Sequence, residues 1–407
     1  MAPELRPCAL ILGFGVHGLA IARSLGRRGI EVEAADPDAA QPHRHSRYCR
    51  RFHDVDSLDD EGLVEFLIGF GRRRRGRTAL FVTMDRTVPL VSAHRDVLQE
   101  YFDFNLPPRT CIDELMDKAR LLGFLERSGA RHPRTASVRG PEALAAAEKS
   151  VGLPCVLKPA LRAPGFKASI ARSSAELAEQ YLRAARHSDA LVVQQWIPGG
   201  DSEVYFCFAY IGRNGQPQGL FVGRKLRQYP NGTGIAASAA GCDDEFVREE
   251  TLRLFKLAEY RGFGSAEFRR DPSTGEYYLI EFTVGRTDYN VACAIANGVD
   301  LPYVGYCDLV GLCYEARAQK NDRIWVDLPR ELKAMRQESG REPRKRWRAV
   351  AEIARCLDPR NVFTLFDPDD IKPFLAHAVD RALAVPRALG RRVVARLCTA
   401  IQFGPPS

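Results

Sequence analysis

Gly264-Ser-Ala-Glu-Phe-Arg-Arg-Asp-Pro-Ser-Thr-Gly-Glu-Tyr-Tyr-Leu-Ile-Glu-Phe-Thr283 holds two runs rich in apolar and aromatic residues around the segment Asp271-Pro-Ser-Thr-Gly275. Asp, Pro, Ser and Gly are typical of tight turns, so the stretch is predicted to form two antiparallel strands joined by a turn. The turn centre lies midway between Glu267 and Glu281. We therefore expect these two carboxylates to face each other across the hairpin.

Two facing carboxylates need a positive charge between them. Opposed positions of an antiparallel pair lie about 4.5–5.5 Å apart at Cβ, and like charges there destabilise the sheet. A divalent cation would remove that repulsion. Magnesium is usually held by one or two protein carboxylates, with substrate phosphates and water completing its octahedron. The pair is therefore a candidate metal site.

The composition is that of a globular protein. The chain has 407 residues, of which 45% are apolar and 27% charged, a length that suggests two or three domains. No apolar stretch approaches the roughly 18 residues of a membrane span, and residues 1–6 lead into a strand instead of a signal peptide, so we expect a cytoplasmic protein. The 11 cysteines include no C-x-x-C pair, which favours reduced thiols over disulfides or zinc ligands.

The net charge of +8 is concentrated at the C-terminal end. Residues 318–407 contain 18 Lys and Arg against 11 Asp and Glu, a difference of +7. Nucleic-acid enzymes more often carry basic residues interleaved with aromatics around the active region. Because the excess here lies beyond the hairpin, we expect no nucleic-acid partner.

The order of predicted elements indicates an α/β region followed by α+β regions. A strand, a glycine turn, a helix and a second strand over 8–36 form a βαβ start. Further helices are predicted over 60–70, 88–100, 117–128, 141–150, 174–187 and 244–260, and further strands over 78–83, 154–158, 190–196, 203–211 and 221–226. The predicted domains are 1–107, 108–188, 189–315 and a basic, mostly helical extension over 316–407.

Gly13-Phe-Gly-Val-His-Gly18 follows the first strand, and Asp36 comes at about the distance expected for a dinucleotide fingerprint. Taken alone, the motif suggests an NAD or FAD enzyme. The downstream region lacks the repeated βα units of a complete dinucleotide fold, and the same turn serves any doubly wound domain that presents a helix N-terminus to a ligand. We favour this second interpretation.

Two lysines are candidates for phosphate binding. Lys158 ends an apolar strand, where a lysine is either a solvated strand end or a point charge for phosphate. Lys167 lies in the glycine-containing loop 160–169, which could close over phosphates as a lid.

Taken together, the motifs resemble the ATP-grasp superfamily over roughly residues 6–315. The resemblance is closest to its carboxylate–amine ligases, which include D-aspartate-ligase-like and peptide-ligase-like proteins. The motifs that carry it are Asp117-Lys118, Gly152-Leu-Pro-Cys-Val-Leu-Lys158-Pro, Val192-Val-Gln-Gln-Trp-Ile-Pro-Gly-Gly-Asp-Ser-Glu203 and Leu279-Ile-Glu-Phe-Thr-Val-Gly-Arg286. Their shared order is far more specific than any one of them.

The resemblance implies an ATP-grasp fold, in which a Rossmann-like pre-grasp domain that does not bind NAD precedes two α+β lobes clasping ATP. It implies that Lys118 and Lys158 hold ATP phosphates, with Lys167 in the loop that covers them. Glu203, or failing it Asp201, would take the ribose hydroxyls. The residues that would meet the adenine are Gln194, Gln195, Trp196 and Ile197, and the ligands of magnesium or manganese would be Glu267, Glu281 and Thr283.

The sequence departs from the family pattern at the second acidic strand. Members commonly read Glu-x-Asn-x-Arg, with Asn as a third metal ligand, whereas this chain reads Glu281-Phe-Thr-Val-Gly-Arg286. Thr283 offers a neutral oxygen, poorer than an amide carbonyl, and the arginine comes one position late. Two carboxylates with phosphate oxygens can still suffice for the metal.

The implied chemistry joins a carboxylate to an amine through an acyl phosphate, with release of ADP. Both substrates would be small molecules, and amino acids are among the candidates. Arg286 is the candidate for stabilising the oxyanion or binding the substrate carboxylate, because guanidinium binds such groups in bidentate fashion. Its alternative is a salt bridge to Glu267 or Glu281. Lys225 and Arg227 could bind phosphate or an acidic substrate, or could be exposed strand residues. The segment 288–290 is a candidate lining of the amine pocket.

Three other functions remain open at this point. A phosphotransferase on the same fold would yield a stable phosphorylated product, and an NAD oxidoreductase would bind nicotinamide without ATP. A non-catalytic, ATP-binding partner protein is suggested by Thr283 and the basic C-terminal end.

The end of the chain contains a predicted basic amphipathic helix. Leu389, Val393, Leu397 and Ile401 recur every four residues among arginines. Such a helix could lie on an anionic membrane surface. We favour packing against the enzyme core or against a second subunit in a homodimer.

Overall fold

The computed structural model describes residues 7–161, 165–339, 358 and 360–383. Three sheets follow one another along the chain: a five-stranded, a four-stranded and a seven-stranded sheet. The predicted helix over 387–403 lies outside the described residues. Every cysteine that the structure describes is free, as predicted.

The N-terminal region is a parallel sheet with strand order β3-β2-β1-β4-β5. Its strands are β1 (Ala9–Leu12), β2 (Val32–Asp36), β3 (Arg51–Asp54), β4 (Thr78–Val82) and β5 (Phe102–Asp103). Helices α1 (Val16–Gly26) and α2 (Glu61–Arg72) lie where the sequence predicts them. The helix predicted over 88–100 is instead two helices, α3 (Thr87–Ala93) and α4 (Arg95–Leu98), because the backbone of His94 leaves the helical region with ψ at 22°.

The second region is an antiparallel sheet with order β6-β9-β7-β8, preceded by two helices. Its elements are α5 (Arg109–Met116), α6 (Lys118–Ser128), β6 (Thr135–Val138), α7 (Leu144–Val151), β7 (Cys155–Pro159), β8 (Ser169–Ala171), α8 (Ser174–Ala184) and β9 (Leu191–Gln195). The predicted division at 188/189 falls before β9, whereas strand pairing places β9 in this sheet, between β6 and β7.

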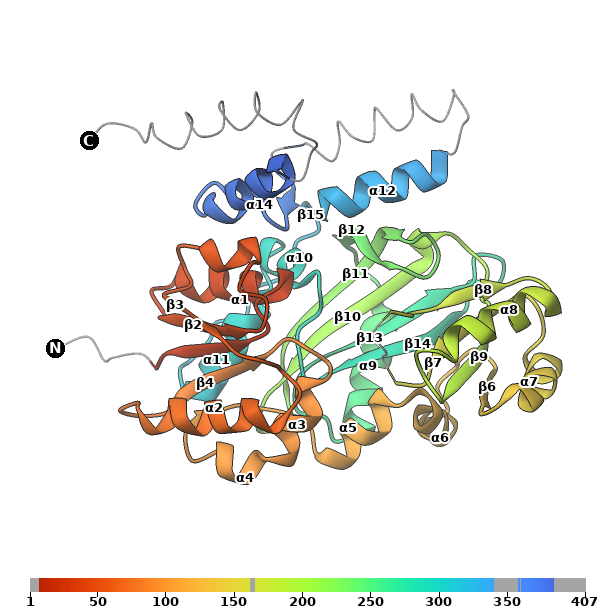
Figure 1. Ribbon diagram of the computed structural model, residues 1–407, viewed down its shortest axis with the longest axis horizontal. Coiled ribbons are helices and arrows are strands. Elements are labelled where there is room, and N and C mark those ends of the chain that lie inside the picture. The colour runs from red at the N-terminus through yellow and green to blue at the C-terminus, as the bar shows by residue number, and fades with distance from the viewer. Residues whose placement is uncertain (1–6, 162–164, 340–357, 359, 384–407) are drawn as a thin grey trace.

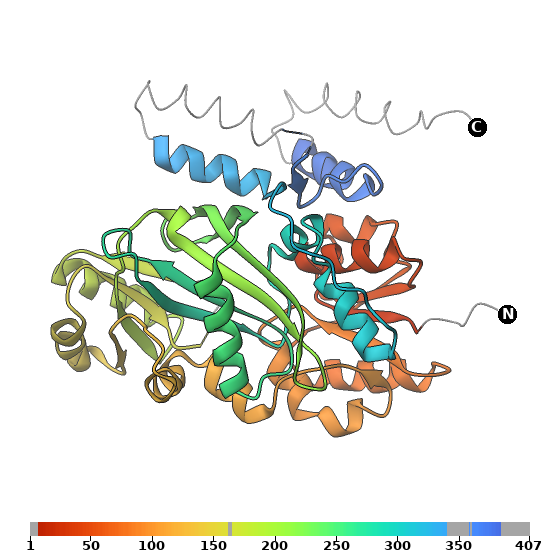
Figure 2. The ribbon, with the colours of Figure 1, turned by 180° about the vertical axis from the view of Figure 1, so that it is seen from behind.

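The third region is a seven-stranded sheet with order β14-β13-β10-β11-β12-β15-β16. Its consecutive strands are β10 (Val204–Ile211), β11 (Pro217–Tyr229), β12 (Ile235–Gly241), β13 (Gly262–Arg270) and β14 (Tyr277–Val284). Helix α9 (Glu245–Leu257) packs on β10, β11 and β13, as Figure 2 shows from behind. Helices α10 (Val291–Ala296) and α11 (Leu301–Val310) pack against α1 of the N-terminal region.

The predicted C-terminal extension is not a separate helical unit. Its strands β15 (Ile324–Val326) and β16 (Val362–Phe363) complete the seven-stranded sheet. Helix α12 (Leu328–Ser339) packs on β11 and β12, and α14 (Lys372–Leu383) lies beside the N-terminal region near residues 42–45 (Figure 1). The extension therefore contacts both the first and the third region.

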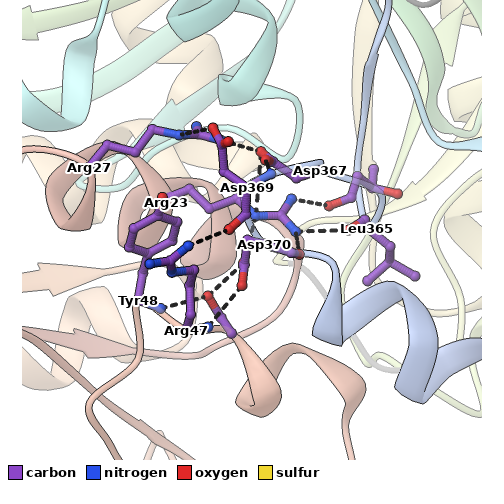
Figure 3. A network of polar contacts seen from close by, with 10 residues as sticks. Arg23, Arg27, Arg47, Tyr48, Leu365, Asp367, Asp369 and Asp370 are labelled. Carbon is purple, nitrogen blue, oxygen red and sulfur yellow. Dashed lines mark hydrogen bonds and ion pairs between the residues drawn. The ribbon is translucent and has the colours of Figure 1, made fainter. Parts of the chain in front are cut away.

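A network of buried charges joins residues 364–370 to the N-terminal region (Figure 3). Arg23 of α1 donates from Nε to Asp370 Oδ2 at 3.0 Å and from Nη2 to the Leu365 carbonyl at 2.8 Å. Asp370 also accepts from Ser46 Oγ at 2.7 Å and from the Arg47 backbone N–H at 2.8 Å. All three guanidinium nitrogens of Arg23 and both carboxylate oxygens of Asp370 have partners within the protein.

Apolar packing divides the molecule differently from the three sheets. Buried side chains of the N-terminal sheet and of the seven-stranded sheet belong to the same clusters, in which Ile11 and Phe81 share a core with Phe208. The four-stranded sheet has its own cluster, built around Leu157, Leu177 and Val193. The first and third regions thus share apolar cores, whereas the four-stranded sheet has a core of its own. Among the described residues, no helix combines the length and apolar character needed to cross a bilayer.

Candidate active site

The hairpin of β13 and β14 places Glu267 opposite Glu281, as the turn chemistry predicts. The pairing register shifts immediately after Glu267, which leaves Ile280 without an opposed residue. Such bulges bend a strand and re-aim neighbouring side chains, and they are frequent beside functional sites. Both carboxylates line two adjoining cavities.

Lysines supply the positive charge that the facing carboxylates require. Lys225 Nζ of β11 lies 2.7 Å from Glu267 Oε2, and Lys118 Nζ at the start of α6 lies 4.0 Å from Glu281 Oε1. The repulsion between the carboxylates therefore does not by itself demand a metal ion. The case for a metal rests on the donors, two carboxylates of the kind that magnesium prefers.

The first cavity, of about 400 Å³, lies between the four-stranded and the seven-stranded sheet. The predicted nucleotide residues that line it are Lys118, Lys158, Lys167, Gln194, Gln195, Trp196 and Ile197, together with Glu267 and Glu281. The structure thus brings together residues that are up to 163 positions apart in sequence, from 118 to 281. Asp201, Glu203 and Thr283 are not among its lining residues.

Lys158 and Lys167, which both line this cavity, form hydrogen bonds with the protein. Lys158 Nζ donates to Gln194 Oε1 at 2.8 Å, across the β7–β9 pair. Burial lowers the pKa of Lys158 to about 8, and the neighbouring Lys118 acts in the same direction while Glu281 opposes it. Lys167 Nζ donates to the Gly234 carbonyl at 2.8 Å, which connects the loop after β7 to the loop after β11.

Arg269 is a site residue that the sequence interpretation missed. Its guanidinium lies 4.2 Å from the centre of the Trp196 ring, and its Nε donates to the Ile197 carbonyl at 2.7 Å. Arg269 therefore fixes the segment that is predicted to meet the adenine. Since alternate residues of a strand share a face, its position two residues after Glu267 on β13 was the available signal.

The two ribose candidates differ in what they contact. Asp201 accepts from the backbone N–H groups of Gln228 and Gly232, each at 2.8 Å, so its carboxylate holds the loop after β11. Glu203 lies 3.7 Å from Arg270 in an ion pair. Because Asp201 is committed to the loop, Glu203 remains the better candidate for the ribose hydroxyls.

The second cavity, of about 360 Å³, lies between the N-terminal region and the seven-stranded sheet. It shares Lys167, Ile235, Glu267 and Glu281 with the first cavity, so the carboxylate pair stands where the two meet. The other charged and polar residues that line it are His17, Thr83, Asp85, Arg86, Lys225, Thr283, Arg286, Asp288, Tyr289 and Asn290.

Arg286 has a partner that the sequence did not predict. Its Nε pairs with Asp85 and its Nη1 donates to the Thr287 carbonyl at 2.8 Å. The predicted alternative, a salt bridge to Glu267 or Glu281, is not the arrangement found. Asp85 and Arg86 follow β4, at the carboxyl end of a parallel strand where ligands commonly bind in α/β sheets. That position was a usable signal, and the sequence interpretation missed it.

Thr283 is directed toward another carboxyl group. Its Oγ1 donates to Asp288 Oδ1 at 2.9 Å, and burial raises the pKa of Asp288 to about 6. Within the described ranges, no third Asp, Glu, His or Cys lies close enough to Glu267 and Glu281 to form a three-ligand group. The donors fit a metal held by two carboxylates and completed by nucleotide oxygens and water.

Arg227 lies away from both cavities. Its guanidinium pairs with Glu331 and, at 2.9 Å, with Glu338 of α12. Lys225 and Arg227 would share a face in a regular strand. The pairing of β11 with β12 is irregular on both sides of Arg227, which turns its side chain toward α12. This placement does not support the predicted catalytic role of Arg227.

The glycine turn before α1 contributes to the second cavity instead of forming a dinucleotide site. Asp36 Oδ2 accepts from the Phe14 backbone N–H at 2.6 Å and Oδ1 from the Asp38 N–H at 2.9 Å, so Asp36 is bonded to backbone around the turn. Gly13 has φ of +87°, and a Cβ there would lie 2.4 Å from Thr83 Oγ1. The turn thus requires glycine for its own geometry, and His17 from the same motif lines the cavity.

Known proteins with similar sequences include ligases. The chain is 24% identical over 353 residues to the D-aspartate ligase of Enterococcus faecium, an alignment covering 79% of this chain and 83% of that protein. It is 30% identical over 199 residues to a D-alanine–D-alanine ligase of Xanthomonas axonopodis, which covers 46% of this chain and 61% of that protein. No protein-family model matches the chain.

Solved structures show the same fold. The biotin carboxylase–β,γ-ATP complex of Campylobacter jejuni superposes with a TM-score of 0.62 at 14% identity, covering 79% of this chain and 75% of that one. The ADP complex of N5-carboxyaminoimidazole synthetase from Staphylococcus aureus gives a TM-score of 0.60 at 15% identity, covering 77% and 80%. At these identities the likeness concerns the fold alone.

Proposed function

From the premise that this chain is an ATP-grasp protein similar to carboxylate–amine ligases, we propose that it is an ATP- and magnesium-dependent ligase. It joins a carboxylate to an amine through an acyl phosphate and releases ADP and phosphate. A cytoplasmic location belongs to the same proposal.

The observation that carries the proposal is the position of Glu267 and Glu281 at the junction of two cavities. The first cavity has the lysines and the Trp196 segment expected for a nucleotide, and the second has mixed charge and is walled by two regions of the chain. A ligase of this kind brings a nucleotide phosphate against two co-substrates, so it needs such a junction. Catalysis then comes from positioning and charge stabilisation.

Glu267 and Glu281 would hold magnesium, and manganese suits the same oxygen donors. When bound, the metal neutralises charge on the nucleotide phosphates. Lys225 and Lys118 already contact these carboxylates through their ammonium groups. With a metal on the carboxylates, those ammonium groups are placed to turn to phosphate oxygens.

The reaction has two balanced steps. A carboxylate oxygen attacks the γ-phosphorus of ATP, the bond to the bridging oxygen breaks, and ADP leaves. The amine nitrogen then attacks the carbonyl carbon, inorganic phosphate leaves, and the nitrogen gives up one proton. In this proposal Arg286, whose Nε pairs with Asp85, stabilises the oxyanion, and Asp288, which lines the second cavity, holds the amine.

The test is a screen for ADP release with magnesium and ATP over pairs of amino acids and small carboxylates. D-aspartate and D-alanine are the first probes, because similar proteins are named for them. We expect ADP formation that needs both a carboxylate and an amine. A stable phosphorylated product without an amide would identify a phosphotransferase instead.

A non-catalytic, ATP-binding partner protein is the second candidate. The observation that favours it is the hydrogen bond from Thr283 to Asp288, at the position where the family pattern has a metal-binding amide. Binding of ATP without turnover across the whole screen would support this candidate and refute the ligase.

A further inference from the structure

Tyr289 of the second cavity is held by a part of the chain that lies beyond the region of family resemblance. Its hydroxyl donates to Asp327 Oδ2 at 2.7 Å and accepts from Arg330 Nε at 3.3 Å. The Arg330 guanidinium also lies 5.1 Å from the centre of the Tyr289 ring. A cation over an aromatic face adds to the attraction of the hydrogen bond.

The Tyr289 ring is fixed between two other rings. The ring centre of His17 lies 5.8 Å away and that of Trp325 lies 5.7 Å away, both in edge-to-face geometry. His17 comes from the N-terminal region, whereas Trp325 belongs to β15 of the extension. Tyr289 is therefore the point where three separate segments of the chain meet at the cavity wall.

Helix α12 carries Arg330, and hydrogen bonds at both ends of the helix hold it in place. Asp327 is 5% exposed and accepts from the Arg330 backbone N–H at 3.2 Å at the start of the helix. Farther along α12, Glu338 Oε1 accepts from Asn231 Nδ2 at 2.9 Å, beside the loop that borders the first cavity. Both ends of the helix are thus attached to walls of the active site.

A polar group without a partner marks the same end of the second cavity. Among the described residues, Asn290 Nδ2 is buried without a hydrogen-bond acceptor, and Asn290 is 6% exposed and lines the cavity. A buried donor that lacks a partner carries a free-energy cost, which a ligand acceptor removes. This end of the cavity is suited to a carbonyl or carboxylate oxygen of a bound molecule.

We propose that Asp327 and Arg330 are positioning residues that fix Tyr289 and so shape the subsite at Asn290 for an oxygen-bearing group of a co-substrate. This inference rests on the proposed ligase function for its kinetic consequence. The affinity for that co-substrate depends on Asp327 and Arg330, whereas the affinity for ATP does not depend on these two residues.

The test compares Tyr289→Phe and Arg330→Gln with the control Arg336→Gln, which makes the same substitution at an exposed position of α12. With the carboxylate–amine pair that releases most ADP, both test variants should raise the KM of one co-substrate about tenfold, the effect of one lost hydrogen bond. The KM of ATP and kcat should stay within about twofold. The double variant should be no worse than the single ones, because both substitutions act through one hydroxyl.

A measurement without substrate separates this inference from the proposed function. Hydrogen exchange of residues 289–296 should accelerate about tenfold in Tyr289→Phe and Arg330→Gln and stay unchanged in Arg336→Gln. Unchanged exchange, or equal increases in the KM of ATP and of the co-substrate, would overturn the inference even in an active enzyme. Absence of any ligase activity in the parent chain, together with accelerated exchange, would refute the ligase alone.

Discussion

Two clusters of charged side chains differ in whether they are enclosed by protein or lie beside a cavity. At Arg23 and Asp370, which are 6% and 1% exposed, the guanidinium and the carboxylate are surrounded by partners of the protein itself (Figure 3). At Glu267 and Glu281 the charges border cavities of about 400 and 360 Å³. Ion pairs of this cluster include Lys225 with Glu267 at 2.7 Å and Lys118 with Glu281 at 4.0 Å.

The difference teaches that the number of charges does not identify a functional site. Buried charges that are fully hydrogen-bonded hold segments together, and removing one partner leaves the other uncompensated. Charges beside a cavity can exchange their contacts with the protein for contacts with a ligand. The following predictions use substitutions that should affect activity or ATP binding at the cavities and the free energy of unfolding at the Arg23–Asp370 network.

The largest effect is expected at Glu281. Glu281→Gln should lower kcat/KM about 1000-fold, because one of the two carboxylates proposed for the metal is lost at the junction of the cavities. The apparent affinity for magnesium in ADP release should fall with it. Glu65→Gln, the same change on the exposed face of α2, should leave both unchanged. Full activity of Glu281→Gln would contradict the proposal that Glu281 binds the metal.

The next effect is on stability and falls on the other cluster. Asp370→Asn should lower the free energy of unfolding by about 3 kcal/mol, because the buried Arg23 guanidinium loses its counter-charge. Urea denaturation measures this. Asp369→Asn is the control, since that side chain is 68% exposed and its pairing with Arg27 is long, at 3.6 Å. Equal stability of the two variants would mean that the Arg23 network does not hold the regions together.

The third effect is on ATP binding in the first cavity. Lys158→Gln should weaken ATP binding about 30-fold, a loss of about 2 kcal/mol for a charge-assisted phosphate contact. Calorimetry with a non-hydrolysable ATP analogue measures it. Lys149→Gln, at an exposed position of α7, should bind as the parent chain does. An unchanged affinity in Lys158→Gln would exclude Lys158 from the phosphate site.

The smallest effect is a dependence on pH. The pKa of Lys158 is lowered to about 8 by burial, so in the free protein the ammonium is lost as pH rises through 8. Phosphate binding favours the protonated form, and affinity should therefore fall about fivefold between roughly pH 7.5 and 9, with proton uptake on binding. Lys158→Arg, which stays charged, should flatten this slope. A parent chain with no slope would show that another cation carries the phosphate contact.

The sequence interpretation succeeded where the deciding interactions are local. Turn residues and two-residue alternation fix the hairpin, so the facing of Glu267 and Glu281 was predictable and is found. Collinear motifs located the residues of the first cavity from Lys118 to Ile197. The split of the helix predicted over 88–100 was missed: the backbone of His94 has a ψ of 22°, outside the helical region.

The remaining choices are made between residues far apart in sequence. Asp85 and Arg286 are 201 positions apart, and Arg23 and Asp370 are 347 apart, so no local pattern relates them. The direction of the Arg227 side chain depends on the irregular pairing of β11 with β12. The carboxylate of Asp201 is occupied by hydrogen bonds from backbone N–H groups in and after β11. Folding alone thus decides which charged side chains are enclosed by partners within the protein and which face a cavity.

The sequence by itself determined the hairpin, the glycine turn and the order of the nucleotide motifs, because turn chemistry and side-chain alternation act over a few residues. The tertiary structure alone decided that the C-terminal segment completes the largest sheet and reaches Tyr289 of the second cavity. The physical reason is that partner choice among charged and polar groups follows from packing of distant segments, which brings them within hydrogen-bonding distance only in the folded chain.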